Sequence, residues 1–244
     1  MLQCVVLAGG AGTRMRPHTE TVPKALLPVL GRPFADWQLR LLAAGGVERL
    51  LYSVGYKGEM IRDFVGDGSR WGLRVRYVDE GERLRGTGGA LRLALDEGAL
   101  DDEFFVLYGD SYLPTDLGAV ERAWRRAQQP ALMTVYRNDD RWDESNAIYA
   151  DGRVILYDKS RPANRVAQMR WIDYGLSVLS QPCVERIPAG DLVDLADHLR
   201  DLSTQGQLAG FEVTERFYEA GSPVGVRDLE RYLSRSPYAA REAK

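Results

Sequence analysis

Short apolar runs alternate with longer segments of helical spacing through the first 136 residues of the chain. Runs such as residues 4–8 and 104–108 are continuously apolar, which is typical of strands buried on both faces of a sheet. The segments between such runs, for example residues 33–44, carry apolar side chains three to four positions apart, as helices do. This β-α-β-α-β-α-β-α-β order predicts a parallel sheet with helices on both faces.

After residue 136 the pattern changes. Two short apolar runs flank Asp151-Gly152, a combination typical of a β-hairpin. The sequence then predicts a strand near residues 172–179, a helix over 192–202, a strand over 208–213 and a helix over 227–233. A chain of 244 residues can form one large domain, and no linker-like segment divides it. We therefore expect a single domain over residues 1–236, with halves 1–136 and 137–236, and a tail at 237–244.

Charge and cysteine content limit the classes of partner. The chain has 32 basic and 35 acidic residues, so it has no overall positive electrostatic potential with which to bind a nucleic-acid backbone. Cys4 and Cys183 are far apart and lack metal-ligand spacing, which favours a reducing cytoplasm over a disulfide or zinc framework. No stretch of 18 apolar residues predicts a membrane span. The expectation is a cytoplasmic monomer or homodimer that binds neither nucleic acid nor membrane.

A glycine-rich turn follows the first predicted strand directly, with glycines at positions 9, 10 and 12. In an open parallel sheet, ligands bind beyond the carboxyl ends of the strands. Glycines at such a place let backbone N–H groups approach a phosphate closely. The turn lacks G-x-x-x-x-G-K-[ST], and Met15 occupies the third glycine position of the dinucleotide fingerprint G-x-G-x-x-G. It therefore predicts a phosphate site of another kind, or else only a tight backbone turn.

Two cationic side chains accompany this turn. Arg14 adds a planar guanidinium whose donors match phosphate oxygens. Lys24 lies in a segment that Pro23 and Pro28 stiffen, so its place is well defined. Because the net charge of the chain is small, any anionic ligand must be held by a local cluster of this sort.

With these residues in place, the chain resembles the sugar-1-phosphate nucleotidylyltransferases. That family opens with G-G-x-G-T-R-[LM]-x-P-x-T and then P-K-x-[LM]-x-P, and residues 9–19 and 23–28 match both blocks nearly residue for residue. The likeness continues at residues 31–34, 86–90, 108–110 and 221–223. It implies a three-layer Rossmann-like α/β fold with a mostly parallel central sheet. It also implies transfer of a nucleoside monophosphate from a nucleoside triphosphate to a sugar 1-phosphate, with Mg²⁺ as cofactor and pyrophosphate as second product.

Within the family, the chain is most similar to the heptose-1-phosphate and mannose-1-phosphate guanylyltransferase-like branch. Residues 86–89 and the pair Tyr56-Lys57 suggest this branch. Thymidylyl- and uridylyltransferases share most of the same blocks, so GTP is the favoured nucleotide rather than the only candidate.

The resemblance assigns residues 1–136 to the nucleotide and residues 137–236 to the sugar phosphate. The turn and the loop near residue 86 would contact the nucleotide through Leu7, Ala8, Gly9, Gly10, Gly12, Thr13, Gly86, Thr87 and Gly88. Arg14 and Lys24 would be catalytic cations. Arg85 stands where the family usually has leucine. Considered without the resemblance, Thr87 is simply the N-cap of a helix.

Asp110 is expected to be a catalytic residue and a Mg²⁺ ligand, because it ends a predicted strand beside the phosphate site. By resemblance the second ligand is Glu219, which occupies the aspartate position of the D-x-G-[ST]-P motif and is one methylene longer. The sugar phosphate would be bound by Asn146, Lys159, Asp173 and Gly175. Taken alone, Asp110 is also compatible with a turn, and Glu219 and Lys159 with a charged surface.

Two other classes of function stay open at this point. A metal-dependent glycosyltransferase also has a nucleotide-binding α/β sheet and an acidic metal site, but it would not need the glycine turn and Lys24 for a triphosphate. A non-catalytic sensor of nucleotides or sugar phosphates is compatible with Glu219 and with the altered neighbours of Lys159. Trp142 or Trp171 could line the sugar pocket.

Overall fold

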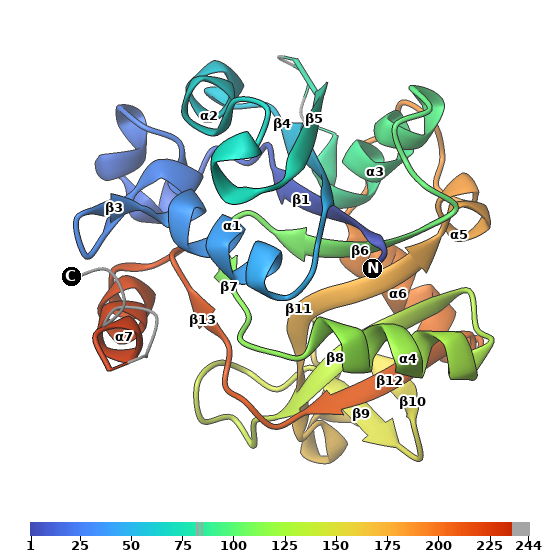
Figure 1. Ribbon diagram of the computed structural model, residues 1–244. Helices are drawn as coiled ribbons and strands as arrows, with labels where there is room; N and C mark the ends of the chain where they lie inside the picture. Colours follow the sequence, from blue (N-terminus) through green and yellow to red (C-terminus); the bar gives the residue numbers. More distant parts are fainter. Residues whose placement is uncertain (82, 84, 236–244) are drawn as a thin grey trace.

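The structure is a computed structural model that describes residues 1–81, 83 and 85–235 (Figure 1). The predicted tail at 237–244 lies outside the described residues. Within them, a nine-stranded sheet is built from β1 (Gln3–Ala8), β4 (Arg49–Val54), β5 (Arg74–Asp79), β6 (Glu103–Tyr108), β8 (Ala131–Arg137), β9 (Ala147–Ala150), β10 (Arg153–Tyr157), β11 (Trp171–Ser180) and β12 (Leu208–Val213). The helices are α1 (Phe34–Ala44), α2 (Gly58–Val65), α3 (Gly86–Asp96), α4 (Leu117–Ala127), α5 (Gln181–Glu185), α6 (Leu195–Thr204) and α7 (Pro223–Leu233).

The strands lie in the order β5-β4-β1-β6-β11-β8-β12-β10-β9. β1 is parallel to both neighbours, with Val5 opposite Leu51 on β4 and Val106 on β6. β11 is inserted between β6 and β8 and is antiparallel to both, whereas β12 is parallel to β8. Among the described strands, only β10 and β11 run against the others, so the sheet is mostly parallel. The second half of the sequence thus contributes strands inside the sheet that the first half begins.

Helices cover both faces of the sheet, which gives the three layers of a Rossmann-like α/β fold. α1, α2 and α4 pack on one face together with Cys4 and Val6 of β1. α3, α5 and α6 pack on the other face together with Val5 and Leu7. Figure 1 shows α1 and α4 on the near side of the sheet and α6 on the far side. Successive strand residues point to opposite faces, so one continuous apolar run supplies both cores.

Four short strands and α7 complete the region beside the first turn. β2 (Pro28–Val29) pairs with β3 (Arg32–Pro33), and β7 (Ser111–Tyr112) pairs with β13 (Tyr218–Glu219). α7 packs on these strands and on α1 in a third apolar cluster. The β7–β13 pairing returns the end of the chain to the end of β6, which matters for the candidate site.

Two helices begin at other positions than the apolar pattern predicts, because capping residues set their starts. α6 begins at Leu195 rather than 192, since the Asp194 side chain accepts a hydrogen bond from Ala196 N (3.0 Å). α7 begins at Pro223 rather than 227, since Ser222 Oγ accepts one from Gly225 N (3.0 Å). Proline at the first helical position has a backbone already suited to a helix.

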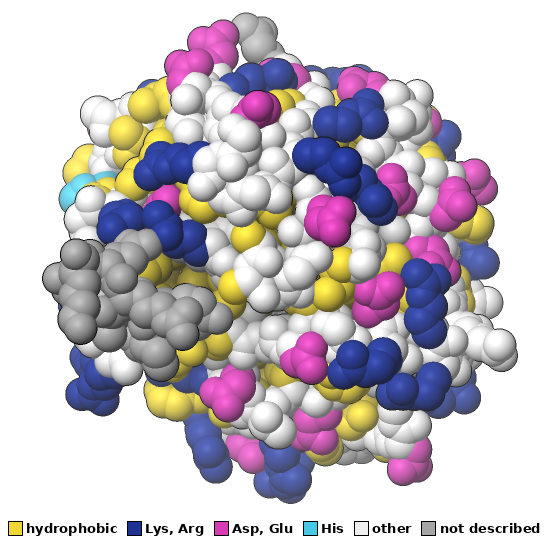
Figure 2. Space-filling view, viewed as in Figure 1, with side chains coloured by type: hydrophobic (Ala, Val, Ile, Leu, Met, Phe, Trp, Pro, Cys, Tyr) yellow, Lys and Arg dark blue, Asp and Glu magenta, His cyan; other side chains and the backbone are white. Residues whose placement is uncertain are grey.

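The surface and the thiols agree with an ordinary globular chain. Acidic and basic side chains are interspersed over the face drawn in Figure 2. Cys4 and Cys183 are free thiols, buried in two different cores, and burial raises the pKa of the Cys183 thiol to about 11. In the part of the chain that the structure describes, no helix is long and apolar enough to cross a membrane.

Candidate active site

The glycine-rich turn follows β1, and hydrogen bonds within residues 12–19 fold it back before the chain reaches Lys24. Gly12 has a φ of 61°, a left-handed conformation that glycine adopts without strain. Its carbonyl accepts hydrogen bonds from Met15 N (2.9 Å) and from Thr19 Oγ1 (2.9 Å). A Cβ on Gly12 would lie 3.4 Å from carbons of the Lys24 side chain. The turn therefore packs directly against the stem of the lysine that the sequence associates with it.

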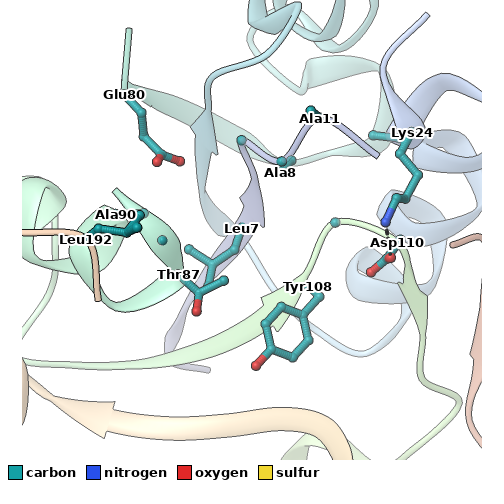
Figure 3. Close-up of a pocket in the computed structure, with 15 residues that line it drawn as sticks. Leu7, Ala8, Ala11, Lys24, Glu80, Thr87, Ala90, Tyr108, Asp110 and Leu192 are labelled. Atoms are coloured by element: carbon teal, nitrogen blue, oxygen red, sulfur yellow. Dashed lines mark hydrogen bonds and ion pairs between the residues drawn. The ribbon is translucent and has the colours of Figure 1, made fainter. Parts of the chain in front are cut away.

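A first cavity, of about 370 Å³, opens where β1, β5 and β6 end and α3 begins (Figure 3). It is lined by the predicted nucleotide-binding residues Leu7, Ala8, Gly9, Gly10, Gly86 and Thr87, and by the predicted catalytic residues Lys24 and Asp110. The remaining lining residues have no role predicted from the sequence; they are Ala11, Ala25, Glu80, Ala90, Tyr108, Gly109 and Leu192. This is the carboxyl end of the parallel strands, where open α/β sheets bind ligands.

The two ends of the first cavity differ in charge. Figure 3 shows the Glu80 carboxylate at one end, on the side of Ala90 and Leu192, and the Lys24–Asp110 pair at the other. Glu80 follows β5 directly. Burial raises the pKa of Glu80 above its ordinary value, although a hydrogen bond from Ser53 Oγ (3.4 Å) opposes this. The cavity thus has one end with apolar side chains and a single carboxylate, and another end with the Lys24–Asp110 ion pair.

Gly9 is needed for the position of Glu80. A Cβ on Gly9 would overlap the Oε1 atom of Glu80. A side chain at position 9 would displace this carboxylate. The first glycine of the motif therefore allows the Glu80 carboxylate to lie over the turn. The sequence alone suggests only that glycines admit a phosphate.

Three predicted nucleotide-binding residues do not line the first cavity, namely Gly12, Thr13 and Gly88. Thr13 is exposed beside the turn. The backbone N of Gly88 donates to Val193 O (2.9 Å), and a Cβ on Gly88 would lie 3.1 Å from Val193 Cγ1. Gly88 therefore serves the contact between α3 and the loop that precedes α6.

The alternative interpretation of Thr87 as the N-cap of its own helix is wrong. α3 begins at Gly86, and its N-cap is Arg85, whose side chain makes no capping hydrogen bond. Thr87 Oγ1 instead donates to Asp194 Oδ1 (2.8 Å) and accepts from Leu195 N (2.8 Å), at the start of α6. The hydroxyl joins two helices that are far apart in the sequence.

A second cavity, of about 740 Å³, adjoins the first. Tyr108 and Asp110 line both, so the two cavities meet at the end of β6. The second cavity is lined by the predicted sugar-phosphate residues Asn146, Lys159, Asp173 and Gly175, together with Arg14 and Glu219. The residues assigned to the two substrates therefore fall into two adjacent spaces.

Lys24, Asp110 and Glu219 converge at the boundary between the cavities. Lys24 Nζ lies 2.8 Å from Asp110 Oδ2, and both side chains are 20% exposed. A Cβ on Gly221 would lie 2.7 Å from Asp110 Oδ2, 2.7 Å from Glu219 Oε2 and 3.4 Å from Lys24 Nζ. The two carboxylates thus face the same point, and Gly221 leaves that point open.

Strand pairing explains how Glu219 reaches Asp110. Glu219 on β13 pairs with Ser111 on β7, the residue directly after Asp110. Ala220 N also donates to the carbonyl of Asp110 (2.8 Å). Glu219 Oε1 accepts a hydrogen bond from Ser222 Oγ (2.5 Å), which orients the carboxylate. These contacts hold side chains 109 positions apart in one place.

The donor set at this boundary suits Mg²⁺ rather than a closed structural metal site. In residues 1–81, 83 and 85–235, no group of three or more His, Cys, Asp or Glu side chains is arranged to hold a metal ion. Mg²⁺ is commonly bound by one or two carboxylates while substrate phosphates and waters fill the other positions. Asp110 and Glu219 supply two carboxylates at the boundary of the cavities, a donor set that fits that arrangement.

Asp173 is a half-buried residue of the second cavity whose carboxylate is held by two hydrogen bonds. Gly175 N donates to Asp173 Oδ1 (2.9 Å), and Tyr157 Oη donates to Asp173 Oδ2 (3.3 Å). Asn146 Oδ1 accepts from Asp173 N (2.9 Å), so Asn146 fixes the backbone here. The β11–β8 register shifts between Asp173 and Ser177, an irregularity of the sort that redirects side chains beside functional sites. Burial raises the pKa of Asp173 above its ordinary value.

The second cavity is also lined by residues with no role predicted from the sequence, among them Arg141, Arg216 and Tyr218. Of the two tryptophans considered for this pocket, Trp142 lines it and lies 3.5 Å from the Arg216 guanidinium. Trp171 is not among its lining residues, and its Nε1 donates to Glu212 Oε1 (2.9 Å). The sequence could have indicated Glu80 as a site residue, because it follows a predicted strand as Asp110 does. No sequence feature indicated that Leu192 would line the first cavity.

Comparison with known proteins gives a consistent result. Residues 3–146 match the family described as nucleotidyl transferase. The chain is 30% identical to the mannose-1-phosphate guanylyltransferase of Mycobacterium tuberculosis, over 97% of this chain and 67% of that protein. It is 28% identical to the UTP--glucose-1-phosphate uridylyltransferase of Synechocystis sp., over 81% of this chain but only 54% of that protein. The chain thus spans about half the length of this relative.

A solved structure shows the same fold. The crystal structure of HddC from Yersinia pseudotuberculosis complexed with GMP-PN has a TM-score of 0.78, at 24% identity, and the match covers 96% of this chain and all of that one.

Proposed function

We propose, on the premise that this chain belongs to the nucleotidyl transferase family, that it transfers a nucleoside monophosphate from a nucleoside triphosphate to a sugar 1-phosphate. The observation that carries the proposal is the shared boundary of the two cavities. Tyr108 and Asp110 line both, and Lys24 lies at the junction. A triphosphate in the first cavity and a sugar phosphate in the second would meet there.

The chemistry follows from that arrangement. A phosphate oxygen of the sugar 1-phosphate attacks the α-phosphorus, the bond to the β-phosphate oxygen breaks, and pyrophosphate leaves. Such transfers need positioning and charge neutralisation more than covalent help from the protein. Lys24 is placed to neutralise charge between the two substrates. Arg14 lines the second cavity and not the first, so it is placed to bind the phosphate of the sugar 1-phosphate.

We also propose Mg²⁺ as the cofactor, held by Asp110 and Glu219. The ion would neutralise phosphate charge at the boundary of the cavities. Asp110 is kept in place by its ion pair with Lys24, and Glu219 by Ser222. A reducing cytoplasm is the proposed compartment, supported by two free, buried cysteines.

Pyrophosphate release tests the proposed function. The protein is incubated with Mg²⁺ and a panel of triphosphates and sugar 1-phosphates, and we expect release only when one matching pair is present. Binding without release would favour a sensor instead. Consumption of a ready-made nucleotide sugar would favour a glycosyltransferase.

GTP is the proposed nucleotide, because Glu80 lies at the end of the first cavity away from Lys24. The edge of guanine carries two adjacent donors, N1–H and N2–H, which match the two oxygens of a carboxylate. Uracil and thymine carry one donor between two carbonyls, and those carbonyls would face the negative charge. The guanylyltransferase from Mycobacterium tuberculosis among the similar proteins also supports this choice.

Glu80→Gln is expected to lower kcat/KM for GTP by about 10- to 100-fold, because a charged hydrogen bond is lost. Glutamine presents an NH2 donor group beside a carbonyl acceptor, which match a carbonyl and the N–H of uracil, so the ratio of UTP to GTP turnover is expected to rise. Pyrophosphate release with each triphosphate measures both effects. Glu59→Gln, an exposed change on α2 that lines neither cavity, is the matched control. Equal loss with GTP and UTP would remove Glu80 from base selection.

The pH dependence gives an independent check on Glu80. Because burial raises its pKa, the Glu80 carboxylate takes up a proton at a higher pH than an exposed glutamate does. The protonated group accepts fewer hydrogen bonds, so affinity for GTP is expected to fall as the pH drops through this pKa. GTP binding by the Glu80→Gln variant should lack this component.

A further inference from the structure

Residues 186–194 form the loop between α5 and α6, which we call the α5–α6 linker. Backbone hydrogen bonds join this linker to the first turn of α3. Val193 N donates to Arg85 O (2.9 Å), and Val193 O accepts from Gly88 N (2.9 Å) and Gly89 N (3.2 Å). A Cβ on Gly86 would overlap the Val193 carbonyl. The glycines at the start of α3 therefore admit the linker, which the second half of the sequence supplies.

The linker takes part in the wall of the first cavity. Leu192 lines that cavity although 72% of its surface is exposed, and it lies beside Ala90 (Figure 3). An apolar side chain held out to solvent at the rim of a cavity is available to a ligand there. Residues from the proposed sugar-phosphate half thus help to form the proposed nucleotide cavity.

Asp194, at the end of the linker, contacts one residue of each cavity. Its Oδ1 accepts from Thr87 Oγ1 (2.8 Å) and from Ala196 N (3.0 Å). Its Oδ2 lies 3.6 Å from Lys159 Nζ. Thr87 lines the first cavity, and Lys159 lines the second. The Asp194 carboxylate lines neither cavity itself, but it links a residue of the first cavity to a residue of the second.

The contacts of Asp194 favour its charged form. Burial alone would raise the pKa of Asp194, but the Ala196 N–H, the Lys159 charge and the Thr87 hydroxyl outweigh burial and hold the pKa below its ordinary value. The Thr87 hydroxyl uses its single hydrogen on Asp194 and also accepts from Leu195 N. Thr87 consequently has one defined orientation, and Asp194 determines it.

We propose that Asp194 is a positioning residue that couples the two substrates, since it orients Thr87 on the nucleotide side and Lys159 on the sugar-phosphate side. The inference rests on the proposed function. A ligand that shifts Thr87 changes the position of Asp194, and with it the position of Lys159. Coupling of this kind is reciprocal, so each substrate changes the affinity for the other by the same factor, and we expect that change to be an increase.

Calorimetry with two unreactive probes tests the coupling. Guanosine 5′-(α,β-methylene)triphosphate cannot be cleaved at the bond in question, and mannose 1-phosphate serves as the second probe. In the unaltered protein with Mg²⁺, each probe is expected to lower the Kd of the other about fivefold or more. Pyrophosphate release with GTP and mannose 1-phosphate is measured on the same samples.

Asp194→Asn separates coupling from helix capping. Asparagine is as good an N-cap as aspartate and keeps an oxygen for Thr87, but it lacks the charge that holds Lys159. Because both side chains of the Asp194–Lys159 pair are about half exposed, the Kd of mannose 1-phosphate is expected to rise about two- to fivefold, and the coupling factor to fall toward one. The Kd of the triphosphate probe alone and the melting temperature should stay nearly unchanged. Asp194→Ala, which also loses the cap, should melt at a lower temperature.

Asp197→Asn is the matched control, because Asp197 lies on the same helix, pairs with Arg200 (3.0 Å) and lines neither cavity. Its coupling factor should equal that of the unaltered protein. If Asp194→Asn keeps both Kd values and the coupling factor, Asp194 is only a helix cap and the inference is overturned while the proposed function stands. If the unaltered protein binds neither probe and releases no pyrophosphate with this pair or with any other of the panel, both fall.

Discussion

Replacing Lys24 by alanine is expected to lower turnover by about 10²–10³-fold, the usual effect of removing one preorganised charge contact at a reacting centre. Lys24 Nζ lies 2.8 Å from Asp110 and faces the open point over Gly221, at the boundary of both cavities. A cation at that place stabilises the transition state more than it stabilises either bound substrate, because negative charge spreads over the oxygens there while the phosphoryl group is transferred. The main loss should therefore appear in kcat.

Single-turnover and steady-state pyrophosphate release measure the effect of Lys24→Ala. Both side chains of the ion pair with Asp110 are only 20% exposed, so removing Lys24 leaves a mostly buried carboxylate unpaired and should lower the melting temperature; circular dichroism at the assay temperature checks that the variant is folded. Lys57→Ala is the control, because Lys57 is a nearby cation that lines neither cavity. Near-normal turnover in Lys24→Ala would mean that the catalytic charge is elsewhere.

Asp110→Asn is expected to reduce turnover by at least about 10²-fold and to shift the Mg²⁺ requirement to higher concentrations. Asparagine has nearly the same shape but lacks the charge that pairs with Lys24 and that suits a hard cation. The experiment is a titration of the initial rate with Mg²⁺. Asp101→Asn, which removes a surface partner of Arg49, should leave the titration unchanged.

Glu219 gives a graded test of the same centre. Glu219→Gln should resemble Asp110→Asn, because it also removes a carboxylate that faces the open point over Gly221. Glu219→Asp keeps the charge and restores the residue usual in the related motif, so it should retain more activity than Glu219→Gln. An unchanged Mg²⁺ titration in both Asp110→Asn and Glu219→Gln would contradict the proposed ligand pair.

Much of the fold was predictable because local patterns report local structure. The continuous apolar run of β1 supplies both cores, and the alternation of strands and helices gives the three layers. The position of the glycine turn at the end of β1 followed from the same alternation. The sequence also contains the capping residues Asp194 and Ser222. The prediction relied on the apolar pattern instead, and its starts for α6 and α7 were wrong.

The placement of β11 could not be predicted in this way. Its apolar run predicts a strand, but no local pattern states that it lies between β6 and β8 and runs against both. Likewise the G-T-G-G segment at residues 86–89 suggests that Gly88 contacts a ligand. In the structure Gly88 instead contacts Val193. Partners distant in the sequence determine both features.

By itself, the sequence determined the layered α/β fold and the group of residues from which a phosphate site could be drawn, because strand and helix periodicity and glycine turns depend on neighbours along the chain. The tertiary structure alone decided that Glu219 faces Asp110, that Glu80 lies over Gly9, and that Asp194 stands between two cavities. Those contacts depend on strand pairing and helix docking between residues as many as 109 positions apart, which no short segment encodes.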